Sequence, residues 1–415
     1  MKHWIAAAGM ALALYTPLHL RAAGVPPPAD LPGTEQAVAA IDQDPAVNQA
    51  RHALQGATHS AAMLSVSPHE WTVSTTAQRR RVDASGTSNE WLLQVERTIR
   101  IGGKAALDRE LGDVGLLQAR SLFGAARNEA ARLLLDHWLD WLTARQAREG
   151  LLEQVGFAQA NVKAVETRRK AGDAAVLELN VAKADLAEVQ RQASLTAAAE
   201  AKAHATLRVR FPQLPLDPRS LSDPALLERD EGQWREQVAA GSKMLHAAQQ
   251  ALRKAELIAE RSRADRLPDP TLGVFTSSEA FRSERVVGLS LSIPLGGSYR
   301  DQSAREALAQ VEVARAGVER QRRDLDVQVA TQVSEATSSF ERWQLAEESA
   351  AASREGARLM QRAFSLGESD LHALLLVRRQ AMEAGAAAIA ARSDALRARY
   401  RLLVDARLLW NLGDD

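Results

Sequence analysis

The sequence predicts a mainly α-helical protein with a small β part, built from a β-hairpin and a long α-helical hairpin that occur twice. The fourteen prolines fall within 17–68, 212–224 and 268–294, so 69–211 and 295–415 lack the residue that interrupts helices. Only 4% of residues are aromatic although 46% are apolar, a composition that suits long, closely packed helices. The third observation is an internal repeat.

Three segments recur in the same order with a nearly constant offset. Residues 68–74 align with 268–274, and Ile99-Arg-Ile-Gly-Gly aligns with Ile293-Pro-Leu-Gly-Gly. Further on, Arg169-Lys-Ala-Gly-Asp aligns with Phe364-Ser-Leu-Gly-Glu, which places Gly172 on Gly367. Each match alone is weak, but their common order indicates an internal duplication.

The repeat divides the whole chain into five predicted parts. The predicted parts are a signal peptide (1–24), an N-terminal segment with a first helix (25–68), the first repeat (69–211), a linker with a helix (212–267) and the second repeat (268–415). Each repeat is predicted to begin with a β-hairpin, at 71–102 and 271–296, and to continue as a helical hairpin, at 105–211 and 299–412.

The first 24 residues have the pattern of a secretory signal peptide. A basic start at 2–3 precedes an apolar run at 4–14, and small residues follow at 22–24. The apolar run is too short to span about 30 Å of hydrocarbon, so we interpret it as a cleaved export signal rather than an anchor.

Apolar and polar residues alternate in both predicted β-hairpins. Such alternation is typical of outer-membrane strands, although it also fits a half-buried sheet in a soluble domain. We predict that Gln94 and Ser290 face water, and that Trp71 and Trp91 lie at opposite edges of the apolar band. Arg97 falls on the apolar face and counts against the membrane interpretation. The predicted lipid-facing positions are Trp71, Val73, Leu93, Val95, Ile99, Val287, Leu289, Leu291 and Ile293.

Three consecutive arginines, Arg79 to Arg81, fall in the predicted loop of the first hairpin. A solvated loop is the simplest interpretation. Contact with lipopolysaccharide phosphates is the alternative, because arginine pairs well with phosphate.

Two long helices are predicted over 105–171 and 299–366, each about 100 Å long at 1.5 Å per residue. A glycine interrupts each helix, and a second helix then returns with apolar and small residues at alternating three- and four-residue spacing. This spacing indicates coiled-coil packing, and the many alanines allow the helices to approach closely. Gly172 and Gly367 are therefore the predicted tips of two helical hairpins. A cytosolic coiled coil would explain neither the strands nor the signal.

Charge and composition exclude several functions. Lys plus Arg (52) equals Asp plus Glu (52), which argues against a nucleic-acid partner. Cysteine is absent, which excludes disulfides, thiolate metal sites and thiol catalysis. His137 and Asp140 lie three residues apart, within reach of one metal, but a solvated helix face is the simpler interpretation. We predict no enzyme activity, no cofactor and no metal site.

Four strands are too few to close a membrane barrel, which needs at least eight. Open sheet edges cannot face lipid. If the two hairpins are membrane strands, several chains must therefore pool them.

Three segments, Arg266-Leu-Pro-Asp-Pro-Thr-Leu-Gly-Val, Val287-Gly-Leu-Ser-Leu-Ser-Ile-Pro-Leu and Phe364-Ser-Leu-Gly-Glu-Ser-Asp-Leu, together with the duplicated layout, resemble the TolC family of outer-membrane efflux proteins. The resemblance implies a homotrimer in which twelve strands form one β-barrel, joined to a periplasmic α-helical barrel. It implies a passive duct through the outer membrane of a Gram-negative bacterium that exports small molecules or metal cations. The implied partners are a periplasmic adaptor, an inner-membrane pump and outer-membrane lipid. The Pro-Asp-Pro segment and Pro212-Gln-Leu-Pro-Leu most resemble the heavy-metal cation efflux branch.

The resemblance also implies that the tips dock the adaptor. In some members, acidic residues one turn past the glycine close the tunnel, but the matching positions here are Ala373 and Leu376. Threefold repetition would still turn nearby carboxylates into rings that favour cations, although carboxylates also suit a helix N-terminus. The predicted docking residues are Gly172, Asp173, Val176, Leu366, Gly367, Glu368 and Leu371, and the predicted acidic ring consists of Asp173, Glu178, Glu368 and Asp370.

A periplasmic coiled-coil adaptor or scaffold protein of an export system is the alternative function. Adaptors also have long helical hairpins. They would, however, need a lipoyl-like β domain and usually contain one hairpin, whereas this sequence contains two.

Overall fold

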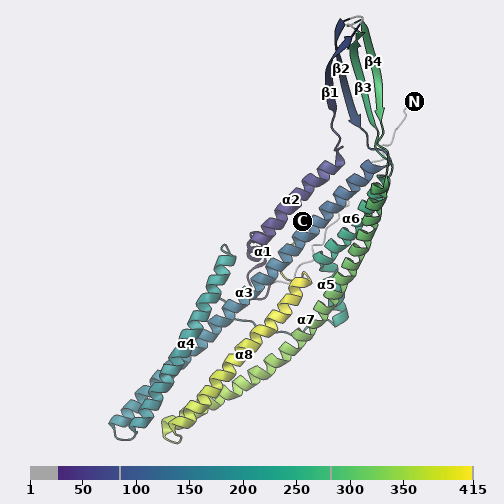
Figure 1. Cartoon of the computed structure of the whole chain (residues 1–415). Helices are drawn as coiled ribbons and strands as arrows, with labels where there is room; N and C mark the ends of the chain where they lie inside the picture. The colour runs from purple at the N-terminus through teal and green to yellow at the C-terminus, as the bar shows by residue number, and fades with distance from the viewer. Residues whose placement is uncertain (1–26, 84–85, 281–282, 414–415) are drawn as a thin grey trace, which may run out of the picture.

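A computed structural model describes residues 27–83, 86–280 and 283–413, and the predicted signal peptide lies outside these ranges. A four-stranded sheet stands at one end of an elongated bundle of helices (Figure 1). In chain order the elements are α1 (Thr34–Asp42), α2 (Pro45–Ser65), β1 (Thr72–Val82), β2 (Gly86–Thr98), α3 (Lys104–Lys170), α4 (Val176–Arg210), α5 (Glu231–Gly241), α6 (Lys243–Ala264), β3 (Thr271–Glu279), β4 (Glu284–Ser292), α7 (Ser298–Leu366) and α8 (Leu371–Asp405).

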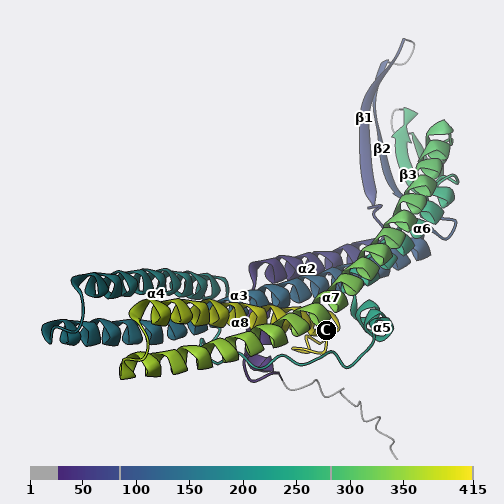
Figure 2. The same ribbon diagram turned by 90° about the horizontal axis from the view of Figure 1, so that it is seen from below.

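The duplicated unit predicted from the sequence is confirmed. Each half contains a shorter helix, a β-hairpin, a long helix and a returning helix, and the returning helices α4 and α8 both have 35 residues. The long helices α3 and α7 have 67 and 69 residues, which corresponds to about 100 Å each. Along α3, α2 packs beside the end near the sheet and α4 beside the far end, and α6 and α8 flank α7 in the same way (Figures 1 and 2).

The two β-hairpins pair with each other. The strand order is β1-β2-β3-β4, all antiparallel, and β2 and β3 pair from Trp91 with Ser278 to Thr98 with Thr271. The sheet therefore joins the two halves of the chain, and β1 and β4 are its unpaired edges. The arginines at 79–81, predicted to lie in the hairpin loop, belong instead to β1. That prediction was wrong because the strands extend beyond the apolar part of the pattern.

The principal core lies midway along the helices. It packs side chains of α1, α3 and α8 with the segments that precede α1 and follow α8, and it includes Trp138, Tyr400 and Trp410. The Tyr400 hydroxyl donates to Asp30 at 3.0 Å, and the Trp138 indole donates to the Asp30 carbonyl at 2.7 Å. Burial and the adjacent Asp30 carboxylate raise the pKa of Tyr400, so its hydroxyl remains a donor at any physiological pH. These bonds fix the N-terminal segment to the bundle.

Small residues set the spacing of the helices near the sheet. A Cβ added to Gly112 of α3 would lie 2.9 Å from the Ala61 Cα of α2. The α2 and α3 backbones can approach this closely because residue 112 has no side chain. None of the helices in the described ranges combines the length and the apolar composition needed to cross a bilayer.

Candidate functional surfaces

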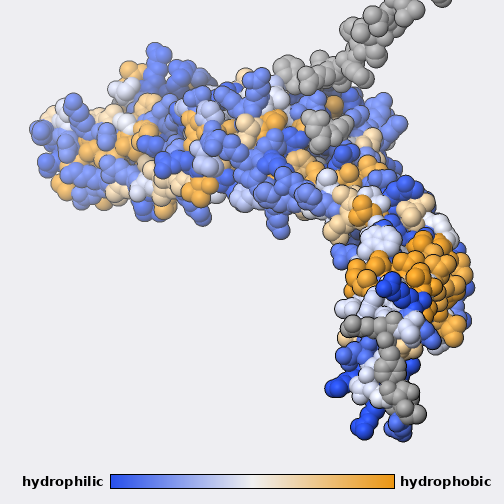
Figure 3. Space-filling view, turned by 90° about the horizontal axis from the view of Figure 1, so that it is seen from above, coloured by the Kyte–Doolittle hydropathy of each residue, from blue (hydrophilic) through white to orange (hydrophobic). Residues whose placement is uncertain are grey.

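One face of the sheet is apolar and exposed. Residues directly opposite each other in an antiparallel pair share a face, so the register defines rows of side chains across the sheet. Four rows make up this outer face: Arg97, Leu272 and Leu291; Val73, Val95, Val274 and Leu289; Thr75, Leu93, Thr276 and Val287; and Ala77, Trp91, Ser278 and Arg285. Leu289 and Val287 are 84% and 82% exposed. Figure 3 shows hydrophobic side chains gathered where the sheet leaves the helices, with hydrophilic ones towards the hairpin ends.

The outer face contains the predicted lipid-facing residues of the strands. Trp71, Ile99 and Ile293 differ from the prediction only in lying one residue beyond a strand end. The sequence reasoning did not name Leu272 and Val274, which are 46% and 53% exposed on β3. Their alternation was present in the sequence, but an aromatic residue on the opposite face, Phe275, obscured it.

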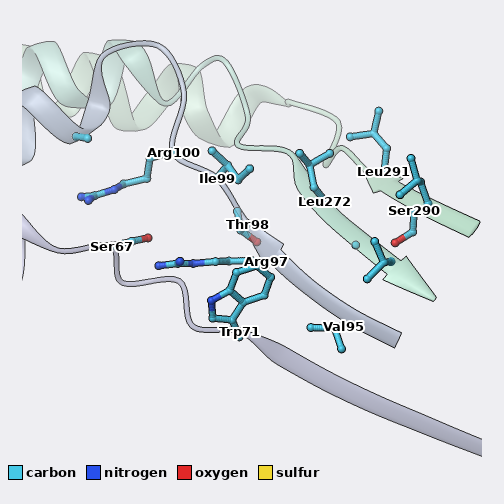
Figure 4. Close-up of a pocket in the computed structure, with 14 residues that line it drawn as sticks. Ser67, Trp71, Val95, Arg97, Thr98, Ile99, Arg100, Leu272, Ser290 and Leu291 are labelled. Carbon is cyan, nitrogen blue, oxygen red and sulfur yellow. The ribbon is translucent and has the colours of Figure 1, made fainter. Parts of the chain in front are cut away.

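The sequence placed a charged residue, Arg97, on the apolar face, and its surroundings are compatible with that face. Its guanidinium carbon lies 5.4 Å from the centre of the Trp71 ring, and its Nε donates to the His69 carbonyl at 3.0 Å. Both residues lie at the helix end of the sheet, beside an apolar groove of about 770 Å³ that Leu272 and Leu291 also line (Figure 4). A cation stacked on tryptophan at the edge of an apolar band is typical of a membrane–water interface.

The opposite, inner face of the sheet is polar. Gln94 donates to Glu96 at 2.8 Å and to Ser290 at 3.3 Å, which places both predicted water-facing residues on this side. Nearer the hairpin ends, the Glu90 carboxylate is 1% exposed and accepts from Gln78 at 2.8 Å and from Arg80 at 3.3 Å. The two faces therefore differ sharply in polarity.

The inner face also carries the large apolar residues Leu92, Phe275 and Val286. Phe275 of β3 packs across Gly288 of β4, where an added Cβ would lie 2.4 Å from the ring. The glycine leaves the space that the ring occupies.

A buried ion network joins the sheet to the helices. Lys104 Nζ, 1% exposed, donates to Asp269 Oδ1 at 2.8 Å and to the Leu267 carbonyl at 2.7 Å. Asp108 pairs with Arg100 and with Arg261, both at 2.7 Å. The network thus connects the segments after β2 and before β3 to α3 and α6.

Asp269, in the Pro-Asp-Pro segment, is the centre of this joint. Its carboxylate also accepts from the Ile101 backbone N–H at 3.0 Å. Partial burial favours a higher pKa, but the bonds from Lys104 and Ile101 outweigh it and hold the pKa of Asp269 below its ordinary value. Gly102 and Gly103 beside it have φ of 69° and 77°, which glycine adopts without strain. The equivalent Gly297 has φ −152° and is extended, so only the first glycine pair makes a left-handed joint.

The two predicted tips are turns with left-handed glycines, φ 86° at Gly172 and φ 79° at Gly367. Beside them, Leu366 and Val176 are 64% and 61% exposed. Leu371 differs: it is 3% exposed and packs against the neighbouring tip, so it is not part of the exposed surface of the tips in this chain. The tips pack against each other, and the residues of their shared cluster are Val165, Leu179 and Ala182 of the first hairpin and Phe364, Leu371 and Leu374 of the second. A single hairpin pattern could not show that the two tips share a core.

The acidic tip residues have different surroundings. Asp370 accepts from the Ala373 backbone N–H at 2.8 Å and caps α8. Glu178 lies 3.9 Å from Arg168, whereas Glu368 and Asp173 have exposed side chains. The acidic ring therefore stays a prediction.

The described residues contain no group of three or more His, Asp or Glu side chains placed to hold a metal. The Asp140 carboxylate, considered above with His137, pairs with Arg397 at 2.5 Å. That arginine in turn contacts Asp136 at 3.1 Å, so these carboxylates serve to join α3 to α8.

Part of the chain is similar to a known protein family. Residues 234–404 match the model of the outer membrane efflux protein family. The matched stretch is less than half of the chain and covers most of α5, all of α6 and most of the second repeat. No curated protein matches the sequence of the chain.

The fold of this chain is shared with solved outer-membrane channels at low sequence identity. The outer membrane protein VceC of Vibrio cholerae is 15% identical, with a TM-score of 0.75 over 92% of this chain and 98% of that one. The MtrE outer membrane channel of Neisseria gonorrhoeae is 17% identical, with a TM-score of 0.72 over 92% and 90%. The CmeC outer membrane channel of Campylobacter jejuni is 12% identical, with a TM-score of 0.72 over 91% and 85%. The partial family match and the shared fold agree with the channel interpretation better than with the adaptor alternative, and they do not single out the heavy-metal branch.

Proposed function

We propose that three copies of this protein form a passive efflux duct through the outer membrane of a Gram-negative bacterium. The observation that carries the proposal is the sheet, which has one exposed apolar face, one polar face and two unpaired edges. Pooling four strands from each of three chains lets β4 of one chain pair with β1 of the next, so that no edge faces lipid. The apolar rows then contact lipid, and the polar rows line the opening.

The helices extend the duct away from the membrane. They reach about 100 Å from the sheet, a length that suits a path across the periplasm. Most of their exposed surface is polar, as a wall in contact with water requires. The tips lie at the end farthest from the sheet (Figure 1).

A periplasmic adaptor linked to an inner-membrane pump docks at these tips. Leu366 and Val176 support this step, because they are large apolar side chains that remain exposed beside two turns. The small molecule or metal cation is selected by the pump, and the duct provides the exit.

Fractionation and mass measurement test the duct. We expect the protein in the outer-membrane fraction, soluble only in detergent, with three chains per particle. In a planar bilayer, the purified trimer should conduct ions. A monomer recovered from the soluble periplasmic fraction would contradict the proposal. Cells that lack the protein should retain the substrate of the associated pump, and the full-length gene should restore its export.

A further inference from the structure

The outer face of the sheet becomes basic beyond its apolar rows. Arg79 and Arg81 of β1 pair with Asn89 and Thr87 of β2, and Arg285 of β4 pairs with Ser278 of β3. Alternation along the strands places all three arginines on the face that carries Trp91. All three are exposed. We call Arg79, Arg81 and Arg285 the basic rim.

The basic rim has no acidic counterpart within the part of the chain that the structure describes. No hydrogen bond or ion pair there involves any of its three side chains. Arg80, between two of them, points to the inner face and pairs with Glu90. Alternation also places Glu279 and Glu284 on the inner face. In this part of the strands the glutamates therefore lie on the inner face with Arg80, whereas the three rim arginines lie on the outer face.

Exposed arginines elsewhere in the described residues include both paired and unpaired ones, and Arg305, Arg320 and Arg323 of α7 are exposed without a partner. On α7, Arg315, Arg322 and Arg358 each pair with a glutamate three residues earlier. The basic rim is distinguished by its placement, because its three unpaired arginines gather on one face of the sheet beside apolar rows.

The height of the basic rim along the strands indicates which anionic groups can balance its positive charge. Arg97 and the row of Arg285 are six residues apart along β2, about 20 Å at 3.3 Å per residue. The apolar band of an outer-membrane strand is about 25 Å tall. Arg81 pairs with Thr87, ten residues from Arg97 and therefore about 33 Å along the strand. Because such strands tilt by about 35–45°, the basic rim extends from about 15 Å to about 25 Å above Arg97. Its far end thus reaches the edge of the apolar band, level with the headgroups of the outer leaflet when the helices lie in the periplasm.

We propose that the basic rim binds the phosphate groups of an anionic glycolipid of the outer leaflet. The planar guanidinium group donates two parallel hydrogen bonds to a phosphate, which a lysine cannot do. Trp91 and the apolar rows beside the rim suit acyl chains, so the ligand that fits is an amphiphile with a phosphorylated head. This inference rests on the proposed duct.

Trimer formation would complete the site. Arg285 is on one edge strand and Arg79 and Arg81 are on the other. When β4 of one chain pairs with β1 of the next, strands from two chains lie about 4.8 Å apart. The rim arginines of neighbouring chains then gather at each of three junctions, where one lipid headgroup can bridge two chains.

Lipid retention by the purified protein tests the proposal. The probes are lipid A with both phosphates, the same lipid with its phosphates removed, and inorganic phosphate, each added to the detergent-solubilised protein. Native mass spectrometry then counts the bound lipids. We expect the wild-type protein to retain the phosphorylated lipid about tenfold better than the dephosphorylated one, a difference of about 1.4 kcal/mol.

Two triple variants separate the basic rim from net charge. Arg79→Gln/Arg81→Gln/Arg285→Gln should retain both lipids equally, whereas Arg315→Gln/Arg322→Gln/Arg358→Gln removes the same charge from α7 and should keep the tenfold preference. Single variants such as Arg285→Gln serve if the rim triple does not assemble, and each should reduce the preference.

Three results would overturn the proposal. They are an unchanged preference in the rim variants, an equal loss in the α7 variant, and complete displacement of the lipid by millimolar inorganic phosphate, which would identify a site for free phosphate. Failure of the duct itself is distinguishable, because it would appear as absence of the wild-type protein from the outer-membrane fraction.

Discussion

Lys104 and Asp269, 165 residues apart in the chain, form a buried ion pair with 2.8 Å between Nζ and Oδ1. The pair connects the start of α3 to the segment that enters β3. It thereby fixes the second β-hairpin to the long helix of the first repeat.

Replacing Lys104 with Met should destabilise the joint strongly. Removal of one partner leaves the other charge buried, which costs about 3–5 kcal/mol. We expect a lower melting temperature of the purified protein and less of it in the outer membrane. Arg315→Met, which breaks an exposed pair on α7, is the control and should have little effect. Equal melting temperatures for the two variants would show that the joint does not depend on this pair.

Acid should weaken the same joint. The folded-state pKa of Asp269 lies below the unfolded value of about 3.9, so the stabilisation is present above that pH. It is lost as the pH falls through the folded-state pKa. Melting temperatures measured from pH 6 to pH 2 should therefore fall less steeply for Asp269→Asn than for the wild type. Parallel curves would contradict this prediction.

Two glycines of α3 should respond oppositely to alanine. At Gly112 the new Cβ would lie 2.9 Å from the backbone of α2, and separating the helices costs about 1–3 kcal/mol. At Gly115 no atom lies within 4 Å, so the gain in helix propensity, about 1 kcal/mol, remains. Thermal melting should show a decrease for Gly112→Ala and an increase for Gly115→Ala. The same sign for both variants would refute the close packing of α2 on α3.

Adjacent residues of β2 should differ in their tolerance of charge. Leu93 lies on the outer face and Gln94 on the inner face. Leu93→Arg places a charge against lipid at a cost of about 2–4 kcal/mol near the midplane, whereas Gln94→Arg remains in water near Glu96. We expect heat-stable trimers on gels from Gln94→Arg and few from Leu93→Arg. Normal assembly of Leu93→Arg would show that the outer face does not contact lipid.

The tips provide a contrast between an exposed and a buried leucine. Leu366→Asp should abolish efflux yet leave trimers and membrane insertion intact, because Leu366 is 64% exposed. Leu371→Asp should impair folding of the tip, because it buries a carboxylate in the shared cluster. Substrate accumulation and trimer yield, measured together, distinguish the two effects.

A third tip variant tests the turn itself. Gly367→Val should resemble Leu366→Asp, because φ of 79° costs a branched residue about 1–2 kcal/mol without any clash. Normal transport by Leu366→Asp and Gly367→Val would show that the tip is only a turn and has no role in docking.

Periodicity in the sequence predicted much of the fold. The helices predicted at 105–171 and 299–366 are observed as Lys104–Lys170 and Ser298–Leu366, because proline-free stretches and tip glycines mark such boundaries clearly. Strand alternation also placed Leu289 and Gln94 on opposite faces. These features depend on residues close in sequence, so a local pattern contains them.

Features that depend on distant residues could not be predicted. The burial of Leu371 depends on Val165 of the other hairpin, and the role of Asp269 depends on Lys104. The extension of β1 through the three arginines depends on its pairing with β2, since an all-charged segment has no apolar alternation to read. Tertiary contacts set each of these outcomes.

The shared core of the two tips bears on how the far end of the protein moves. Because Phe364 and Leu371 of one hairpin pack with Val165 and Leu179 of the other, neither hairpin can swing outward without exposing this core to water. In the proposed trimer, each chain would therefore contribute one rigid body to the end of the duct rather than two. A trimer would then have three independently moving units at that end. A partner that displaces one hairpin of a chain would also displace the other hairpin of the same chain.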